Sequence, residues 1–129
     1  MNASQAMNTY RNVGVQSAID DASPHRLIAM LLDGALDRVA SARGAMERGD
    51  TATQGSLIGK TITILDNMRV SLDHEQGGEL AGRLAALYEY MQRRLLEASS
   101  RTDTAILDEV ASLLREIKTG WDGIPAEYR

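Results

Sequence analysis

The sequence predicts an all-α protein: an antiparallel up-and-down four-helix bundle with a short N-terminal helix or arm packing across it. Three observations support this prediction. Apolar residues recur at spacings of three and four along four successive segments, which is the period of one helix face. Only two of the 129 residues are proline, so helix breakers are rare. The polar stretches between the segments are short, as expected between antiparallel neighbours.

The chain length fits a single domain, within which we expect three regions. Residues 1–22 are polar with scattered small apolar residues, and we interpret them as a mobile N-terminal arm. Residues 23–122 contain the four periodic segments and form the helical bundle. Residues 123–129 begin with glycine and contain a proline, so we expect a frayed tail.

The first predicted helix begins at Ser23-Pro24. Serine caps free backbone N–H groups, and proline suits the first helical position. The helix ends near Arg48, where Gly49 supplies the left-handed residue that commonly follows a helix. Its broad apolar face comprises Ile28, Leu31, Ala35, Val39, Ala42 and Met46, flanked by Leu27, Met30 and Gly34.

The second predicted helix is capped by Asp50 and is a poor helix on propensity alone. Gly55 and Gly59 weaken it, and residues 61–65, taken by themselves, would suit a strand. We favour a helix because the apolar spacing continues beyond this run and no partner strand exists elsewhere. The apolar face comprises Leu57, Ile58, Thr61, Leu65, Met68 and Leu72, broadened by Ile62 and Ile64.

Residues 74–78 are rich in polar residues and glycine and predict a loop before the third helix. Glu79 suits the first turn, where the helix dipole favours negative charge. The third helix ends near Ser99-Ser100, and Asp103 caps a fourth that Gly120, Gly123 and Pro125 bring to an end. The two apolar faces comprise Leu80, Leu84, Leu87, Met91, Leu95 and Ala98, then Ile106 or Leu107, Val110, Leu114, Ile117 and Trp121.

Composition excludes several classes of function. The chain has no cysteine, which removes disulfides, thiolate metal sites and cysteine nucleophiles. Its net charge of −4 argues against general nucleic-acid binding. There is neither an apolar run of membrane-spanning length nor a secretory leader pattern, so we expect a cytoplasmic protein.

The two histidines offer no catalytic or metal site. A di-iron bundle needs glutamate three residues before each histidine, but alanine precedes His25 and serine precedes His74 at that spacing. Both histidines lie at predicted helix ends or loops, where we expect them to be solvated. Gly77-Gly78 precedes no lysine and is interpreted as a plain turn rather than a phosphate site. We therefore predict no enzyme activity, no cofactor and no metal.

The remaining polar and aromatic features favour packing roles. We expect the cluster around Arg93 and Arg94 to form a solvated face that pairs with nearby acids. Tyr88 and Tyr90 point about 200° apart on a helix, and Tyr88 is the better core residue while Tyr90 is the exposed one. Asp33 is either structural or accepts a hydrogen bond from a partner. Gly34 would allow close helix approach, whereas Gly55 and Gly59 suit either a partner's backbone or a tolerant exposed face.

The apolar stripes on the first two helices are wider than a bundle seam needs. Leu27, Met30, Ile58 and Ile62 are either ordinary core or the wall of a groove for a partner's apolar face. Composition cannot separate the two readings, because leucine, isoleucine and methionine serve both.

Several of these residues form a pattern that resembles the flagellar secretion chaperone family FliS. The pattern begins with Tyr10-x-x-Val13-x-Val15 and continues with the run from Ala22-Ser23-Pro24-His25 to Asp33-Gly34-Ala35. It ends with Gly49-Asp50, Gly77-Gly78-Glu79, Leu87-Tyr88-x-Tyr90-Met91-x-Arg93-Arg94-Leu95 and Trp121. Glu89 and Gly82 depart from the residues common in that family, and the helix with Gly55 and Gly59 is the least standard part.

The resemblance implies a non-enzymatic export chaperone. Such a protein binds the disordered C-terminal segment of flagellin one to one, prevents its premature polymerisation and helps deliver it to the flagellar type III export gate. An alternative is a dimeric helical adaptor, or a regulator that binds an anti-sigma factor or another flagellar protein. The partner-binding residues we predict are Met7, Tyr10, Val13, Val15, Leu27, Met30, Leu31, Asp33, Gly34, Ile58, Ile62, Leu65, Tyr90 and Arg94.

Overall fold

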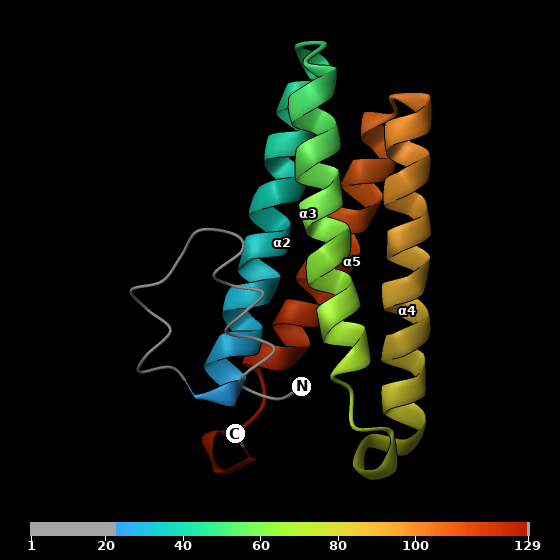
Figure 1. The fold of residues 1–129 in the computed structure, drawn as a ribbon. Coiled ribbons are helices and arrows are strands. Elements are labelled where there is room, and N and C mark those ends of the chain that lie inside the picture. The colour runs from blue at the N-terminus through green and yellow to red at the C-terminus, as the bar shows by residue number, and fades with distance from the viewer. Residues whose placement is uncertain (1–22, 129) are drawn as a thin grey trace.

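The computed structural model describes residues 23–128, and in that range it consists of four α-helices and one 3₁₀ turn. The elements are α2 (Pro24–Glu47), α3 (Thr51–Val70), α4 (His74–Arg101), α5 (Thr104–Asp122) and η1 (Ala126–Tyr128). Successive helices run in opposite directions, and α5 returns to lie beside α2 (Figure 1). Each helix lies close to its two neighbours in this ring, whereas no Cα atoms of opposite helices come within 8 Å of each other. The predicted all-α up-and-down bundle is confirmed, while the predicted arm lies outside the described residues.

Every α-helix begins at a side chain that accepts a hydrogen bond from the first turn. The bonds run from Arg26 N to Ser23 Oγ at 3.1 Å, Thr53 N to Asp50 at 3.2 Å, Gln76 N to Asp73 at 3.0 Å and Ala105 N to Asp103 at 3.0 Å. Three of these four caps follow from the sequence pattern. The left-handed Gly49 is confirmed as well, with a φ of 72°.

The prediction of a loop over residues 74–78 is wrong for the first residues of that range, which are helical. Asp73 caps a helix that begins at His74, and its backbone carbonyl accepts a hydrogen bond from Gly77 N at 2.8 Å. Gly78 then interrupts the helix, because its φ of 50° and ψ of −125° suit only glycine. The long body of α4 follows this break and ends at Arg101, slightly later than predicted.

The helical interpretation of α3 is confirmed despite its weak propensity. The buried Thr61 hydroxyl donates to the Leu57 carbonyl at 2.9 Å, which satisfies its polar atom within the helix. Thr63 makes the same kind of bond to the Gly59 carbonyl at 3.1 Å. Packing against α2 and α4 therefore outweighs the preference of this segment for extended structure.

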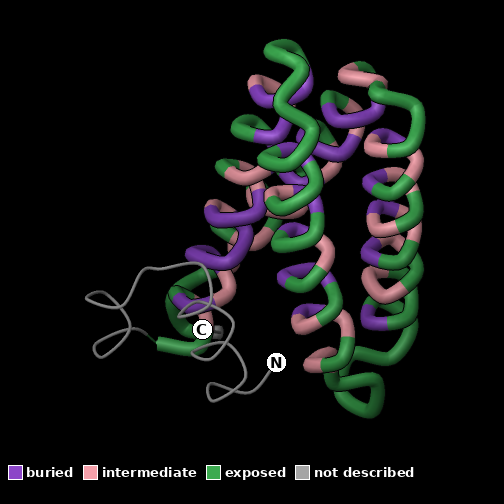
Figure 2. Tube along the Cα trace, turned by 45° about the horizontal axis from the view of Figure 1, so that its top comes forward, coloured by how far each residue is buried: buried purple, intermediate pink, exposed green. Residues whose placement is uncertain are grey.

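The core occupies the space between the four helices, and the buried stretches of each helix face inward (Figure 2). Tyr88 is 4% exposed and belongs to the core as predicted. Two other expectations are wrong. Leu80 was assigned to the inner face of α4 but is 64% exposed, because it lies next to the break at Gly78. Gly34 does not serve close helix approach, since no atom of another described helix lies within 4 Å of a Cβ built there.

Candidate functional site

An apolar pocket of about 410 Å³ lies at one end of the bundle. It sits where α2 and α4 begin and where α3 and α5 end, so all four helices contribute to its wall. The lining residues are Ile28, Leu32, Met68, Leu72, Leu80, Leu84, Tyr88, Glu116, Ile117, Gly120, Trp121 and Ile124. Glu116 is the only charged residue among them. Size and lining suit the capture of apolar groups rather than chemistry on a polar substrate.

The break at Gly78 explains why this end of the bundle is open. Leu72 and Leu80 flank the turn that joins α3 to α4, and both line the pocket. Leu80 remains largely exposed at this edge although it is apolar, whereas Leu95 further along α4 is fully buried. The same helix thus forms core at one end and an accessible apolar wall at the other.

The pocket wall is held together by a pair of stacked rings, His25 of α2 and Trp121 of α5. Their centroids lie 4.9 Å apart and their planes differ by 7°. The indole Nε1 donates to the His25 carbonyl at 2.9 Å, and His25 Nε2 lies 2.8 Å from the Trp121 carbonyl. Because a carbonyl only accepts, His25 Nε2 must carry its proton in this contact. We call this pair the clasp.

The clasp corrects the expectation that both histidines are solvated. His25 is half-buried and joins residues that are 96 positions apart in sequence. His74 is exposed, as expected. The difference arises because the start of α2 meets the end of α5, a tertiary contact that no local pattern around His25 reveals.

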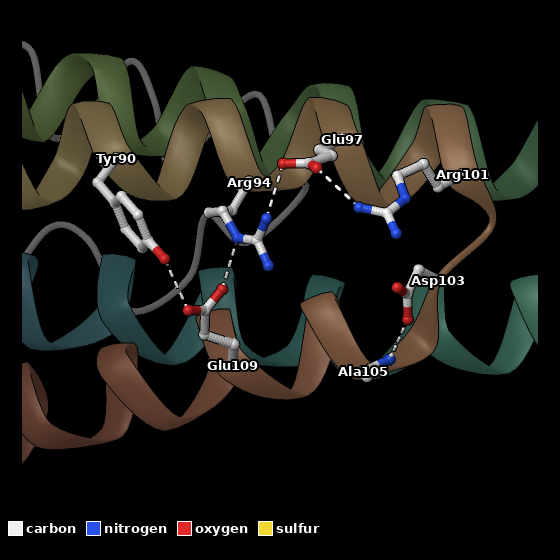
Figure 3. Close-up of polar contacts among 7 residues, drawn as sticks. All are labelled: Tyr90, Arg94, Glu97, Arg101, Asp103, Ala105 and Glu109. Atoms are coloured by element: carbon white, nitrogen blue, oxygen red, sulfur yellow. Dashed lines mark hydrogen bonds and ion pairs between the residues drawn. The ribbon is translucent and has the colours of Figure 1, made fainter.

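A polar network joins α4 to α5 away from the pocket (Figure 3). Glu109 accepts hydrogen bonds from Arg94 Nε and from the Tyr90 hydroxyl, both at 2.7 Å. Glu97 in turn pairs with Arg94 at 2.7 Å and with Arg101 at 2.9 Å. The predicted pairing of the basic face with nearby acids is confirmed for Arg94, and Tyr90 is half-buried rather than freely exposed.

These contacts shift the titration of the groups involved. Hydrogen bonds from Arg94 and then Tyr90 hold the pKa of Glu109 below its ordinary value. Hydrogen bonds from Arg101 and Arg94 do the same to the pKa of Glu97. The pKa of Tyr90 is raised, chiefly by its hydrogen bond to Glu109. In the core, burial raises the pKa of Tyr88 to about 12, so its hydroxyl stays protonated at neutral pH.

The structure distributes the predicted partner-binding residues over several places. Met7, Tyr10, Val13 and Val15 lie outside the described residues. Leu27, Met30, Leu31, Ile58 and Leu65 are buried in the core, Gly34 is buried on α2, and Ile62 is partly buried on α3. Asp33 pairs with Lys118 at 3.2 Å, in line with its structural alternative. Tyr90 and Arg94 lie in the polar network, and a role in partner binding stays a prediction for the whole set.

None of the predicted partner-binding residues in the part of the chain that the structure describes lines the pocket. Sequence reasoning placed the groove on the first two helices and did not predict this pocket; the groove itself stays a prediction. One sign was present in the sequence: Leu72 and Leu80 bracket a stretch of polar residues and two glycines, a place where apolar side chains have little of their own helix to pack against.

The described residues contain no group of acids and histidines that would hold a metal ion. None of the described helices has the length and apolar character needed to cross a membrane. Fold and site together define a helical-bundle protein with an apolar binding pocket.

Comparison with known proteins gives the family. The family model described as flagellar protein FliS matches residues 6–128. The flagellar secretion chaperone FliSB of Pseudomonas aeruginosa is 54% identical over 124 residues, covering 96% of this chain and 98% of its own. The FliS chaperone of Salmonella typhimurium is 43% identical over 125 residues, covering 96% and 93%, and that of Vibrio cholerae is 37% identical over 123 residues, covering 95% and 90%.

The chain belongs to the FliS family of flagellar secretion chaperones. It is accordingly a flagellar export chaperone and not an enzyme. The resemblance given by the sequence motifs is confirmed over nearly the whole chain.

The clasp yields a prediction about stability. Replacing His25 with alanine removes the ring stacking and a partly buried hydrogen bond, so the free energy of unfolding should fall by about 1–3 kcal/mol. Urea unfolding followed by circular dichroism measures this. Trp121 is the only tryptophan, so its fluorescence reports the loss of stacking directly. The control is His74→Ala at an exposed site, and equal effects of the two substitutions would contradict the role of the clasp.

The polar network yields a prediction about pH. The pKa of Glu109 is lower in the folded state than in the unfolded chain, so its stabilising contribution is present above about pH 4.3. That contribution is lost as the pH falls through the folded pKa. Wild type should therefore lose more stability between pH 7 and acid pH than Glu109→Gln, measured by urea unfolding at both. Asp37→Asn, which removes an exposed carboxylate that forms no ion pair among the described residues, should behave as wild type. An equal loss in Glu109→Gln and wild type would contradict the assignment.

Proposed function

We propose that this chaperone binds the C-terminal segment of flagellin one to one in the cytosol, prevents its premature polymerisation and delivers it to the flagellar export gate. The observation that supports this proposal is the apolar pocket of about 410 Å³, open at the end of a bundle in a chain of the FliS family. A client segment that is disordered when free would order as its apolar side chains enter the pocket.

The physics of this step is coupled folding and binding. Burial of apolar surface favours the complex, and the entropy lost in ordering the client offsets much of that gain. Because these two terms oppose each other, the affinity for the client stays moderate for the surface area buried. A moderate affinity suits a chaperone that must release its client at the export gate. Binding alone holds the client, so the proposal involves no nucleotide and no cofactor.

Within the proposal, the pocket supplies the anchor site. Leu80 is exposed at the pocket edge before any client binds, so it is accessible without unfolding of the core. The buried residues predicted as groove, such as Leu31 and Leu65, would become accessible only if helices separated. We therefore expect the first client contacts at the open end.

The pocket assignment is tested with a synthetic peptide of the flagellin C-terminal segment. We expect a one-to-one complex, a gain in helical circular dichroism and a change in Trp121 fluorescence. Leu80→Glu places a charge on the apolar wall and should weaken binding by about tenfold or more. Leu96→Glu is the matched control, because Leu96 lies on the same helix, is 61% exposed against 64% for Leu80, and does not line the pocket.

The possible results test the identity of the client and its binding site separately. No binding to wild type at micromolar concentration would contradict flagellin as the client and favour the adaptor or regulator alternative. Equal weakening by the two glutamate substitutions would keep the client and contradict the pocket as its site.

The arm supplies a second part of the proposal. Residues 1–22 contain apolar anchors, including Met7 and Tyr10, in an otherwise polar stretch. We propose that the arm covers an apolar groove in the free chaperone and moves aside for the client. Hydrogen exchange of residues 5–20 should then change when flagellin peptide is added, and unchanged protection would contradict the movement. Tyr10→Ala should alter client or export-gate binding with little effect on the melting of the bundle.

A further inference from the structure

The pocket contains one feature that apolar capture does not explain, the carboxylate of Glu116. The other lining residues are apolar or glycine, apart from the hydroxyl of Tyr88 and the indole N–H of Trp121. That indole N–H is already used in the clasp. Glu116 lies on the exposed side of α5 at the pocket edge, so its charge is hydrated while the pocket is empty.

The carboxylate of Glu116 has no ion pair among the described residues, unlike the charges around it. Lys118, two positions along α5, is held by Asp33 at 3.2 Å and by Asp122 at 2.9 Å. Arg83 of α4 pairs with Glu79 at 2.5 Å. Arg115 precedes Glu116 in sequence but points about 100° around the helix and does not line the pocket. Among residues 23–128, the one charge that lines the pocket is therefore negative and has no ion-pair partner.

The surface next to Glu116 is open. Gly120 lies one helical turn beyond it and also lines the pocket. A Cβ built on Gly120 would meet no described atom within 4 Å beyond its chain neighbours and the adjacent backbone of its own helix. A side chain of a bound segment can therefore approach the carboxylate along this side of α5 while an apolar neighbour enters the pocket.

We infer that Glu116 is a specificity-determining residue: the pocket selects a client segment that carries a lysine or arginine beside its apolar anchor. The inference rests on the proposed function of the pocket as the client site. An ion pair at the rim adds modest affinity but strongly disfavours segments with an acid at that position, because like charges would then meet in a partly desolvated place. The net charge of −4 acts in the same direction by attracting basic segments.

A double-mutant cycle tests the inference. Each lysine and arginine of the flagellin C-terminal peptide is replaced by glutamine in turn, and every peptide is titrated against wild type and Glu116→Gln by Trp121 fluorescence. One replacement should weaken binding to wild type by about two- to fivefold and have no effect on Glu116→Gln. Replacing the same basic residue with glutamate should weaken binding further, and Glu116→Lys should restore it.

The control is Asp37→Asn on α2, which changes net charge by the same amount away from the pocket. It should show no coupling to any basic residue of the peptide. If no basic residue couples to Glu116, or if Asp37 couples equally, the inference is overturned while the proposed function stands. If the unmodified peptide does not bind wild type at all, the proposed function itself fails. A dimer in light scattering that Leu80→Glu converts to monomer would assign the pocket to a second copy of the chain and also overturn the inference.

Discussion

The closure of the helix ring between α2 and α5 is the constraint on which the site depends. Two rings stacked 4.9 Å apart, each linked to the other residue's backbone carbonyl, fix the start of one helix against the end of another. Without that contact the four helices would still share a core, since the fully buried Leu65, Leu95 and Leu107 do not line the pocket. The wall formed by Ile28, Ile117 and Trp121 would lose part of its support, because the clasp joins α2 to α5 at this end together with the Asp33–Lys118 ion pair.

The opposite wall follows from a local break. Gly78 cannot continue α4 in its observed conformation, so the helix restarts beside the pocket and leaves Leu80 at the rim. An exposed apolar wall lowers the solubility of a free protein, and under the proposed function it serves as the binding surface for an apolar client segment. Beyond the pocket, the polar network of Tyr90, Arg94 and Glu109 holds α4 against α5. The apolar wall is therefore accessible only at this end of the two helices.

The sequence predicted the fold because helix periodicity and capping are local properties. Ser23, Asp50 and Asp103 act as caps and Gly49 is left-handed, each for a reason readable within a few residues. The cap at Asp73 was missed because the two glycines that follow looked like a loop. The pocket was not predicted, since it forms where four helix ends meet and includes residues 96 positions apart. Apolar type alone cannot tell Leu65, which is fully buried, from Leu80, which is not.

We propose that the client occupies the open end of the bundle. Methyl NMR of the chaperone bound to the flagellin C-terminal peptide tests it most directly. Intermolecular contacts should appear between the peptide and the methyl groups of Ile28, Ile117 and Leu80, all of which line the pocket. The opposite result would be contacts confined to other faces, such as the surface around Leu96, while the pocket methyl groups stay unchanged. That result would contradict binding of the client at the open end.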